Sequence, residues 1–540
     1  MPEVVAQLRS AGPAAEIGYA RTAAWGSRWA TSQIVANKVA TIVAMLVVAQ
    51  MLTPTELGMA HVVNTVVGFI TIMPVLVMAD VLISHQRHLT AVARAAWGVA
   101  AVVGLAFALV IALSSPVVAA HYDKYSFQAL AFLLAVSGVR PIAEALMIFP
   151  WTRLRLALRF KHVAIVNGLT RFSATVLMVA WAVVEPGAAA IVVPQILMTV
   201  ARAVWFGVIA GGPAPRASRQ RRLERRPELL RRIRNRMRRD FVVASLAQYV
   251  HTVTSGLAFL VATQFVSPAE IGQLAFAMML APQLVGMFTV QVGTVLQPIF
   301  GRLKSEPARQ VAGFRRAAAL IGAIGVPVML LQAALAEPGI ILFFGEKWLP
   351  AVPMLIAISL GQATISLLPT TLSLLKAQGR FGTALVWQAV QAVVFLAIGI
   401  PAAERFGAVG VTAVDSAVWT VSLFVAAWMA MRAGGVTLWR AFACLALPWA
   451  PAIPIAVGAW FAWKALPFET TTSAAIAIGV IGPAALLVSL VAIRVTQPIA
   501  AAEMAPTVAR VLRRLPLVGP SIADWFMAVR APAIPESPRS

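Results

Sequence analysis

The feature that most constrains this chain is a series of fourteen apolar stretches, each about 20 residues long and separated by short polar segments. An α-helix needs roughly 20 apolar residues to cross a hydrocarbon core of about 30 Å. The stretches fall near residues 29–50, 59–82, 92–113, 127–149, 163–184, 188–210, 241–265, 272–298, 317–335, 351–375, 383–402, 406–430, 441–463 and 472–493. We therefore expect an all-α, polytopic membrane protein with about fourteen transmembrane helices.

The composition agrees with this expectation. Apolar residues make up 60% of the 540 residues and charged residues 12%, against roughly 45–50% and 25% in an ordinary soluble domain. The net charge of +24 alone would suggest a nucleic-acid-binding protein, but such proteins are rich in charge overall. The single cysteine, Cys444, excludes a disulfide framework and a cysteine-based metal site. Residues 1–28 are charged and lack the apolar core of a signal peptide, so we expect the first stretch to remain a membrane span.

Basic residues are abundant in every second segment that joins the spans and rare in the segments between. Segments on one side of the membrane carry 36 of them, whereas the opposite segments hold only Lys124, Lys347, Arg405 and Lys464. Cytoplasmic loops of membrane proteins are enriched in Lys and Arg, so the first side, with both termini, is predicted to be cytoplasmic. A missed span would disturb this alternation, which therefore supports the count of fourteen. Topology also accounts for most of the net positive charge.

Two segments of the chain match each other at an offset of 214 residues. LVVAQMLTPTELG at 46–58 and LVATQFVSPAEIG at 260–272 share six identical residues in thirteen. Each lies at the outer end of the first helix of its half. Halves of seven spans would have opposite topologies, so we predict two parallel halves of six spans, with a cargo cavity between them. The expected domains are a cytoplasmic segment 1–28, a first lobe 29–210, an Arg-rich cytoplasmic linker 211–240, a second lobe 241–430, two further helices within 441–493 and a cytoplasmic tail 494–540.

The repeated segment contains the pattern Pro-x-Glu-x-Gly, which is typical of a turn between two helices. We expect the proline to end one helix, the glutamate to stabilise the N-terminus of the next, and the glycine to permit the tight turn. The residues are Pro54, Glu56 and Gly58 in the first half and Pro268, Glu270 and Gly272 in the second. A structural role is favoured over contact with a substrate.

Several short motifs together resemble one transporter family. The first copy of the turn fits LxPxExG at Leu52, Pro54, Glu56 and Gly58, and FGEKWLPAVPML, before the expected tenth helix, fits FGxxWxPAVPxL. LLKAQGR at 374–380 and RFK at 159–161 complete the set. The chain is thereby similar to the multidrug/oligosaccharidyl-lipid/polysaccharide exporter superfamily and, within it, to the polysaccharide-unit flippases (Wzx-type), over about residues 25–500.

The resemblance implies a two-lobed transporter of twelve to fourteen helices. Such a protein moves undecaprenyl-diphosphate-linked sugar repeat units from the cytoplasmic to the outer leaflet of the bacterial cytoplasmic (inner) membrane. Its expected partners are the lipid-linked oligosaccharide, membrane lipids, a polysaccharide polymerase and a chain-length regulator. The family has no catalytic signature, so no catalytic residue, cofactor or metal is assigned.

Four basic residues that the connecting segments do not account for, and three acids, lie within the expected spans. An ionisable group in a span costs roughly a few kcal/mol on insertion scales, so each must face a cavity or a partner. The cations all fall in the first half of the chain, whereas the second half contributes one acid. The cations are Lys38, Arg140, Arg171 and Arg202, and the acids are Asp80, Glu144 and Asp415.

A cationic wall in the first half suits a lipid diphosphate, because phosphate oxygens prefer the forked donors of arginine. The predicted substrate-site residues are Lys38, Arg140, Arg202 and Arg171. The alternative is pairing: Arg140 and Glu144 lie four residues apart on one helix and can neutralise each other, while Arg171 and Asp80 can reach interfacial water. All three acids are also candidates for coupling to protons or sodium ions, with structural hydrogen bonding as an equal alternative.

The arginine-rich segment LLRRIRNRMRRDF at 229–241 has its apolar residues on one helical stripe. We expect an amphipathic helix on the anionic inner leaflet, where each Arg contributes about 1 kcal/mol. Nucleic-acid binding is disfavoured, because no aromatic platform or recognition fold accompanies the run. The chain has no Walker A motif, its six histidines lack metal-ligand spacing, and its longest outer loops have about fifteen residues, so we do not expect an enzyme.

Two alternatives to the flippase stay open at this point. One is a cation-coupled multidrug or small-molecule antiporter of the same superfamily, and the other is a non-transporting membrane scaffold of a polysaccharide assembly complex. A cavity rich in Arg and Lys favours a diphosphate cargo, whereas an acidic cavity with aromatic walls favours cationic drugs.

Overall fold

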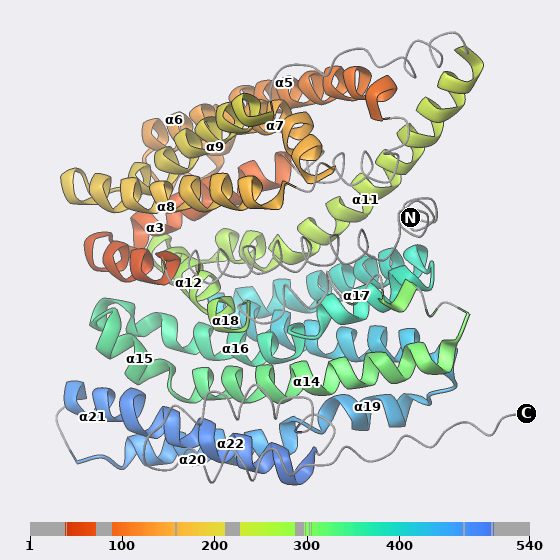
Figure 1. Cartoon of the computed structure of the whole chain (residues 1–540). Coiled ribbons are helices and arrows are strands. Elements are labelled where there is room, and N and C mark those ends of the chain that lie inside the picture. The colour runs from red at the N-terminus through yellow and green to blue at the C-terminus, as the bar shows by residue number, and fades with distance from the viewer. Residues whose placement is uncertain are drawn as a thin grey trace, which may run out of the picture. The chain divides into compact units, whose positions relative to one another are not determined.

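The structure of the protein is a computed structural model, shown in Figure 1. It describes residues 38, 40–71, 89–156, 159–210, 227–286, 296, 299–301, 303, 305–467, 470–497 and 501. Every regular element within these ranges is a helix. The chain divides into two compact units, Met1–Gly256 and Leu257–Ser540.

The helices of the first unit begin with a short apolar helix, Ala40–Met51. It is followed by α3 (Pro54–Ile70), α5 (Leu89–His121), α6 (Phe127–Ser137), α7 (Val139–Leu156), α8 (Phe160–Val184), α9 (Ala188–Ala210) and the larger part of α11 (Pro227–Phe265).

The second unit continues from the end of α11. Its elements are α12 (Pro268–Leu280), α14 (Pro307–Ala334), α15 (Ala336–Phe343), the 3₁₀ helix η2 (Glu346–Ala351), α16 (Val352–Ile365), α17 (Leu368–Ala377), α18 (Phe381–Met431), the 3₁₀ helix η3 (Arg432–Gly434), α19 (Leu438–Ala446), α20 (Trp449–Lys464), α21 (Thr470–Ile476), the π-helical turn η4 (Ala477–Ile481) and α22 (Gly482–Thr496).

These helices confirm the expected fold class. Each of the fourteen expected spans coincides, in whole or in part, with a helix of the described residues. Nine helices in the described ranges are long and apolar enough to cross a membrane. One of them, Phe127–Leu154, combines α6 with α7, and another, Glu346–Ala377, includes α16 and α17. The chain is a multi-pass membrane protein.

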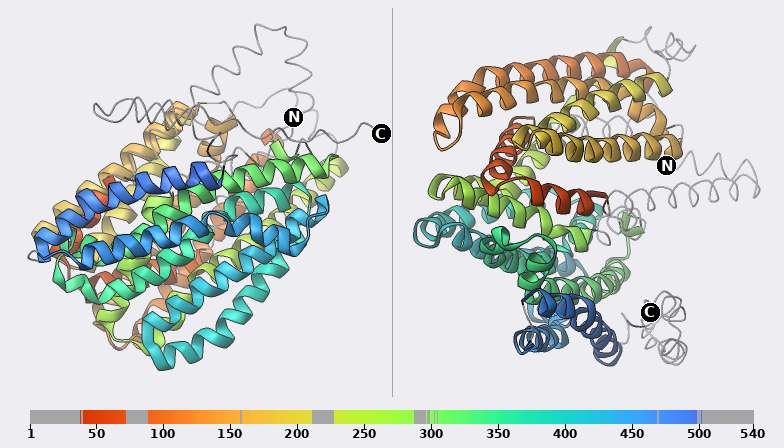
Figure 2. Two further views of the ribbon diagram at one scale, coloured as in Figure 1. Left: turned by 90° about the horizontal axis from the view of Figure 1, so that it is seen from below. Right: turned by 90° about the vertical axis from the view of Figure 1, so that its left-hand side faces the viewer.

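Packing in the first unit centres on α7 and α9. A buried cluster joins Met147 and Leu154 of α7, Val166 of α8 and Phe206 of α9. Figure 2 shows helices of the first unit, in orange to yellow, running side by side, and α7 packs against α5 while α9 packs against both α7 and α8. This arrangement places α9 between the two helices and decides which polar side chains of the unit meet.

The repeated turn begins a helix in both units. Thr53 caps α3, because its hydroxyl oxygen accepts the N–H of Glu56 at 3.4 Å while the Glu56 carboxylate accepts the N–H of Thr53 at 2.8 Å. Ser267 caps α12 by accepting the N–H of Glu270 at 3.3 Å. Such caps satisfy the N–H groups that the start of a helix leaves without partners. The expected capping role of Glu56 is confirmed.

The expected role of the two motif glycines is wrong. Gly58 and Gly272 are buried inside α3 and α12, and neither has the positive φ that a glycine-dependent turn requires. The lack of a side chain at such a position allows close approach between helices in a membrane. Pro54 and Pro268 occupy the first turn of their helices, where the missing N–H has no helical partner to lose.

The arginine-rich linker continues directly into a membrane span. α11 runs unbroken for 39 residues, from Pro227 to Phe265 (Figure 1). The interfacial helix expected at 229–241 is therefore not a separate element. The boundary between the two compact units falls inside α11, after Gly256, and the expected lobe limits at 210 and 241 stay a prediction.

The FGEKWLPAVP motif is a structural element of the second unit. Trp348 is fully buried and stacks on Phe276 of α12, with 4.3 Å between ring centroids. Phe344 meets the same Phe276 ring edge-on at 4.9 Å. Gly345 has φ +85, which an L side chain rarely adopts, and it lets the chain turn from α15 into η2. The motif therefore packs against α12 through aromatic contacts.

The LLKAQGR motif joins two helix ends in the second unit. Gly379 turns the chain with φ +77, and the side chains on either side of it reach back to the end of α18. Gln378 Nε2 donates to the carbonyl of Ala430 at 2.9 Å, and Arg380 Nη1 donates to the carbonyl of Met429 at 3.0 Å. These donors satisfy carbonyl groups that the C-terminus of a helix leaves without partners.

Two of the expected spans, 383–402 and 406–430, meet within α18. Gly407, near the start of the second of these spans, has φ 57 and ψ −144, so the backbone bends there instead of continuing as one helix. The two helices expected within 441–493 belong to the second unit, since Ala456 of α20 and Ala485 of α22 share a buried cluster with Met329 of α14.

Candidate functional site

The start of α7 places two of the predicted charges one helical turn apart. α6 ends at Ser137 and α7 begins at Val139, with Gly138 between them. A Cβ at Gly138 would lie 3.1 Å from the carbonyl oxygen of Ala108 in α5, so a larger residue there would make the contact between the helices tight. α7 then carries Arg140 in its first turn and Glu144 in its second.

Arg140 is held by an amide of α3. Its Nη1 donates to Asn64 Oδ1 at 2.8 Å, and both side chains are half-buried. Glu144 lies within electrostatic range of Arg140 but forms no ion pair with it among the residues that the structure describes. The two side chains interact electrostatically without a direct ion pair among the described residues, so the predicted alternative of mutual neutralisation stays open.

Arg202 joins the same group from α9. It lies within electrostatic range of Glu144, Arg171 and Arg140, because α9 packs between α7 and α8. Its Nε is buried and has no hydrogen-bond partner among the described residues. A buried charged donor without a partner is costly, which makes this atom, within the described part of the chain, a candidate for contact with a ligand oxygen.

The two remaining cations extend the group. Arg171 of α8 is exposed on the surface of the unit and lies within electrostatic range of both Arg202 and Lys38. Lys38 is half-buried. The first unit thus connects all four predicted cations through their mutual electrostatic interactions, and the described part of this group includes one carboxylate, Glu144. We refer to Lys38, Arg140, Glu144, Arg171 and Arg202 as the cation cluster.

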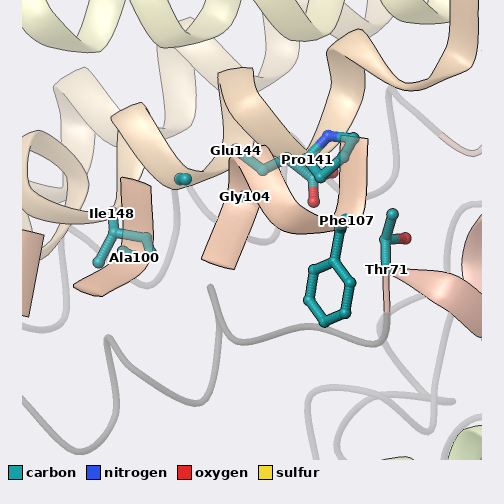
Figure 3. Close-up of a pocket in the computed structure, with 8 residues that line it drawn as sticks. Thr71, Ala100, Gly104, Phe107, Pro141, Glu144 and Ile148 are labelled. Atoms are coloured by element: carbon teal, nitrogen blue, oxygen red, sulfur yellow. The ribbon is translucent and has the colours of Figure 1, made fainter. Parts of the chain in front are cut away.

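A small pocket adjoins the cation cluster at Glu144. Its empty volume is about 240 Å³, including its open mouth. Figure 3 shows the residues that line it, which come from the end of α3, from α5 and from α7. The lining is mostly apolar or small: Thr71, Ala100, Gly104, Phe107, Pro141, Glu144, Ala145 and Ile148. A carboxylate in such surroundings is poorly solvated, so its charge depends on the nearby guanidinium groups.

Asp415 lies in the second unit and is described apart from the cluster. It is half-buried on α18, and the Trp419 side chain one turn along is hydrogen-bonded to it. Trp419 itself packs edge-on against Trp387, with 6.4 Å between ring centroids. Asp80, the third predicted acid, lies outside the described residues. Within the described residues no group of three or more His, Cys, Asp or Glu side chains is placed to hold a metal ion.

Sequence reasoning missed Asn64, which contacts the predicted site directly. The available signal was an amide side chain within an apolar helix, since intramembrane polar residues as well as charged ones tend to be buried against partners. Its amide carries no charge, which sets Asn64 apart from the charged residues predicted to form the site.

The chain matches the model of a family described as polysaccharide biosynthesis protein over residues 47–353. It is also similar to the succinoglycan biosynthesis transport protein ExoT of Rhizobium meliloti (strain 1021), with 27% identity over 144 residues. That alignment covers 26% of this chain and 28% of the relative, so the chain matches less than a third of the relative's length.

Solved transporter structures share the fold. The lipid II flippase MurJ in an inward closed conformation superposes with a TM-score of 0.66 at 12% identity, covering 85% of this chain and 97% of that one. An inward-facing multidrug resistance MATE family transporter of the MOP superfamily gives a TM-score of 0.55 at 11% identity, covering 74% and 95%. A mutant of the Vibrio cholerae MATE transporter VcmN gives 0.51 at 13% identity, covering 78% and 98%. At these identities the likeness concerns the fold alone.

Proposed function

Because the chain belongs to the polysaccharide biosynthesis protein family, we propose that it is a flippase for undecaprenyl-diphosphate-linked oligosaccharide repeat units. We also infer that it is a flippase or exporter of the multidrug/oligosaccharidyl-lipid/polysaccharide exporter superfamily, which the family match, the related transport protein and the shared fold support. The proposed transport crosses the cytoplasmic membrane by alternating access and serves the synthesis of exopolysaccharide, capsule or O-antigen.

The cation cluster is the observation that carries this choice of cargo. Four cations and one carboxylate interact electrostatically within one unit of a membrane protein. Ionisable groups in a span are expensive, and like charges at close range add to that expense. An anionic cargo offsets both costs, since each phosphate oxygen accepts charge-assisted hydrogen bonds from guanidinium groups. The buried Nε of Arg202, which has no hydrogen-bond partner among the described residues, supports a site that is completed by a ligand.

A lipid diphosphate fits the chemistry of this cluster better than a cationic drug does. Its two phosphate groups carry several negative charges and offer paired oxygens that match the arginine fork. A cationic drug would meet an excess of positive charge, because the three described arginines of the cluster outnumber its one described acid. The antiporter of the same superfamily remains the second candidate on the strength of the fold shared with MATE transporters, with Glu144 and Asp415 as its proposed coupling acids.

The remaining assignments follow from the same proposal. The protein lies in the inner membrane of a bacterium, with both termini in the cytoplasm, as the basic loops indicate. Its cargo is built on the cytoplasmic face, and a polysaccharide polymerase and chain-length regulator are its proposed partners on the outer face. No nucleic acid and no cofactor take part, and the chemistry is transport, not catalysis.

Transport in proteoliposomes tests the proposal. The full-length protein is reconstituted with a fluorescent undecaprenyl-diphosphate-linked oligosaccharide, and its accessibility to an external reductant is followed. We expect Arg140→Gln and Arg202→Gln each to lower transport about tenfold or more, as loss of one charge-assisted contact implies. Arg309→Gln is the matched control, because Arg309 is exposed and paired with Glu306 at 2.7 Å outside the cluster. Unchanged transport by both cluster variants would overturn the assignment.

A further inference from the structure

We propose that Asn64 is a positioning residue of the cation cluster: it fixes the orientation of the Arg140 guanidinium and, being neutral, leaves its positive charge available to an anionic cargo. This inference rests on the proposed function, since it concerns the same anion site. Nothing in the family match or in the names of the related proteins assigns a role to this residue.

The first step of the argument is geometric. Asn64 and Arg140 lie 76 residues apart, on α3 and α7, and are joined by the 2.8 Å hydrogen bond from Nη1 to Oδ1. A guanidinium group is planar and has five N–H donors in fixed directions. One short hydrogen bond to one end of the plane therefore restricts the whole group and leaves the other donors free to point elsewhere.

The second step concerns charge. A carboxylate in the place of the Asn64 amide would accept the same hydrogen bond, and it would lower the cost of the buried cation by pairing with it. Such a pair would also cancel the charge that attracts an anion. The amide provides the same acceptor atom without this neutralisation. Glu144, the acid nearest in sequence, forms no ion pair with Arg140 among the described residues.

The third step is the contrast with Arg202. Its Nε is buried without a hydrogen-bond partner in the described part of the chain, whereas Arg140 is anchored. In the described part of the chain the cluster therefore combines one oriented guanidinium on α7 with one donor on α9 that has no partner. An anion with two phosphate groups can engage both, because α7 and α9 pack directly against each other.

Substitutions at Asn64 separate positioning from a merely structural role. The full-length protein in detergent is titrated with undecaprenyl diphosphate, and the Tm without ligand is measured in parallel. We expect Asn64→Gln to bind within about threefold of the parent, Asn64→Ala about three- to tenfold more weakly, and Asn64→Asp about tenfold or more weakly. The Tm of Asn64→Asp should equal or exceed that of the parent, because the new ion pair stabilises Arg140.

The Asp variant is decisive because the two roles predict opposite results. A purely structural Asn64 is replaced well by the isosteric Asp, so binding at the parental level by a folded Asn64→Asp protein would overturn the proposal. If that variant does not fold, Asn64→Leu compared with Asn64→Gln decides instead: about tenfold weaker binding by Leu at similar Tm supports positioning, and equal binding by the two overturns it.

A double variant that restores the net charge gives a further test. Its recovery of binding affinity would not be expected if Asn64 had only a structural role. Asn64→Asp combined with Glu144→Gln returns the cluster to its original net charge, so we expect it to regain most of the lost affinity, and failure to regain any would overturn the charge argument. Gln283→Glu, which adds an acid to a helix of the second unit, is the matched control and should leave binding unchanged. Undecaprenol, which lacks phosphate, should not distinguish any of the variants.

The same titration separates this inference from the proposed function. If Arg140→Gln and Arg202→Gln bind undecaprenyl diphosphate as the parent does, the anion site itself is wrong. If those variants lose affinity while Asn64→Asp keeps it, the site is correct and only the role of Asn64 is wrong.

Discussion

The carboxylate of Glu270 accepts the backbone N–H of Ala408 at 3.1 Å through its Oε1 atom. The bond joins the first turn of α12 to the bend in α18, where Gly407 has φ +57. Glu56, the matching residue of the first unit, bonds instead to Thr53 in its own turn. The glutamate of the motif therefore completes the N-terminal cap of its own helix in the first unit. In the second unit it links α12 to α18 through a hydrogen bond.

Removing the Glu270 carboxylate should loosen the second unit. A hydrogen bond with a charged acceptor contributes about 1.5–3 kcal/mol, and we expect Glu270→Ala to cost about 1–2 kcal/mol because Glu270 is partly exposed. Glu270→Gln keeps an acceptor oxygen and should lose less than half of that. Thermal unfolding in detergent measures both. Equal losses for Ala and Gln would show that the hydrogen bond to Ala408 contributes nothing.

A side chain at Gly407 should be poorly tolerated. Its φ and ψ of 57 and −144 lie in a region nearly restricted to glycine, and an added Cβ would lie 2.7 Å from Glu270 Oε1. We expect Gly407→Ala to destabilise the protein by about 1–3 kcal/mol. The double variant with Glu270→Ala should cost less than the two single losses together, because the clash disappears with the carboxylate. Strict additivity in the unfolding data would contradict this coupling.

Replacing either of two glycines of α5 by alanine should affect the Tm differently. A Cβ at Gly104 would lie 2.8 Å from the carbonyl oxygen of Pro141 and from the Ala145 side chain, so α5 and α7 would have to separate. At Gly98 an added Cβ meets nothing within 4 Å, and alanine should stabilise the helix by about 0.5–1 kcal/mol. We expect Gly104→Ala to lower the Tm and Gly98→Ala to leave it unchanged or raise it. A similar Tm for both would mean that the helices are not in close contact at Gly104.

Truncation of Trp348 should be the most damaging change in the second unit. The side chain is 0% exposed and stacked on Phe276, and removal of a buried Trp costs about 3–5 kcal/mol. Lys464→Ala is the control, because its ion pair with Glu337 at 2.8 Å is 36–40% exposed and contributes about 0–1 kcal/mol. Expression and monodispersity in detergent, followed by thermal unfolding, compare the two. A smaller loss of stability for Trp348→Ala than for Lys464→Ala would refute the structural role of the motif's aromatic packing.

Tyr125, in the loop between α5 and α6, should be better replaced by phenylalanine. Its hydroxyl oxygen is buried and has no partner among the described residues, and burial, with a smaller effect of Tyr122, raises the pKa of Tyr125 above its ordinary value. Since the neutral form is favoured in the fold, stability is full below the unfolded pKa of about 10 and falls as the pH rises beyond it. Tyr125→Phe should raise the Tm at neutral pH and reduce its decline above about pH 10. A lower Tm would indicate a hydrogen bond at this hydroxyl.

The sequence was sufficient to predict the elements whose physics is local. Apolar length predicted the spans, because hydrocarbon thickness sets how many residues a helix needs. The charge-bearing helices of the first half were also predicted, since Arg140 and Arg202 are conspicuous in apolar surroundings. Their approach to each other depends on the packing of α9 against α7, which follows from the fit of many side chains and has no signature in a single motif.

The errors have equally specific causes. The segment 229–241 changes from polar to apolar without a helix breaker, since neither proline nor glycine occurs between Pro227 and Gly256, so a division by hydropathy cut one helix into two. Gly58 and Gly272 follow a proline and a glutamate, as turn glycines do, but the caps at Thr53 and Ser267 begin the helix earlier. In each case backbone hydrogen bonding decided the structure, whereas the prediction relied on residue type.

Because α11 is a single unbroken helix, a tilt of its apolar part displaces its arginine-rich end. With a rise of 1.5 Å per residue, the helix is about 58 Å long, and its first 14 residues extend about 21 Å beyond the apolar part. A helix without an internal break transmits rotation, so a tilt of only 10° about its apolar part would sweep the arginine end through roughly 4–7 Å. A spin label at Asn235, which is exposed in the arginine-rich part of α11, would therefore move farther than the apolar part of the helix. Spectroscopy can resolve a displacement of this size.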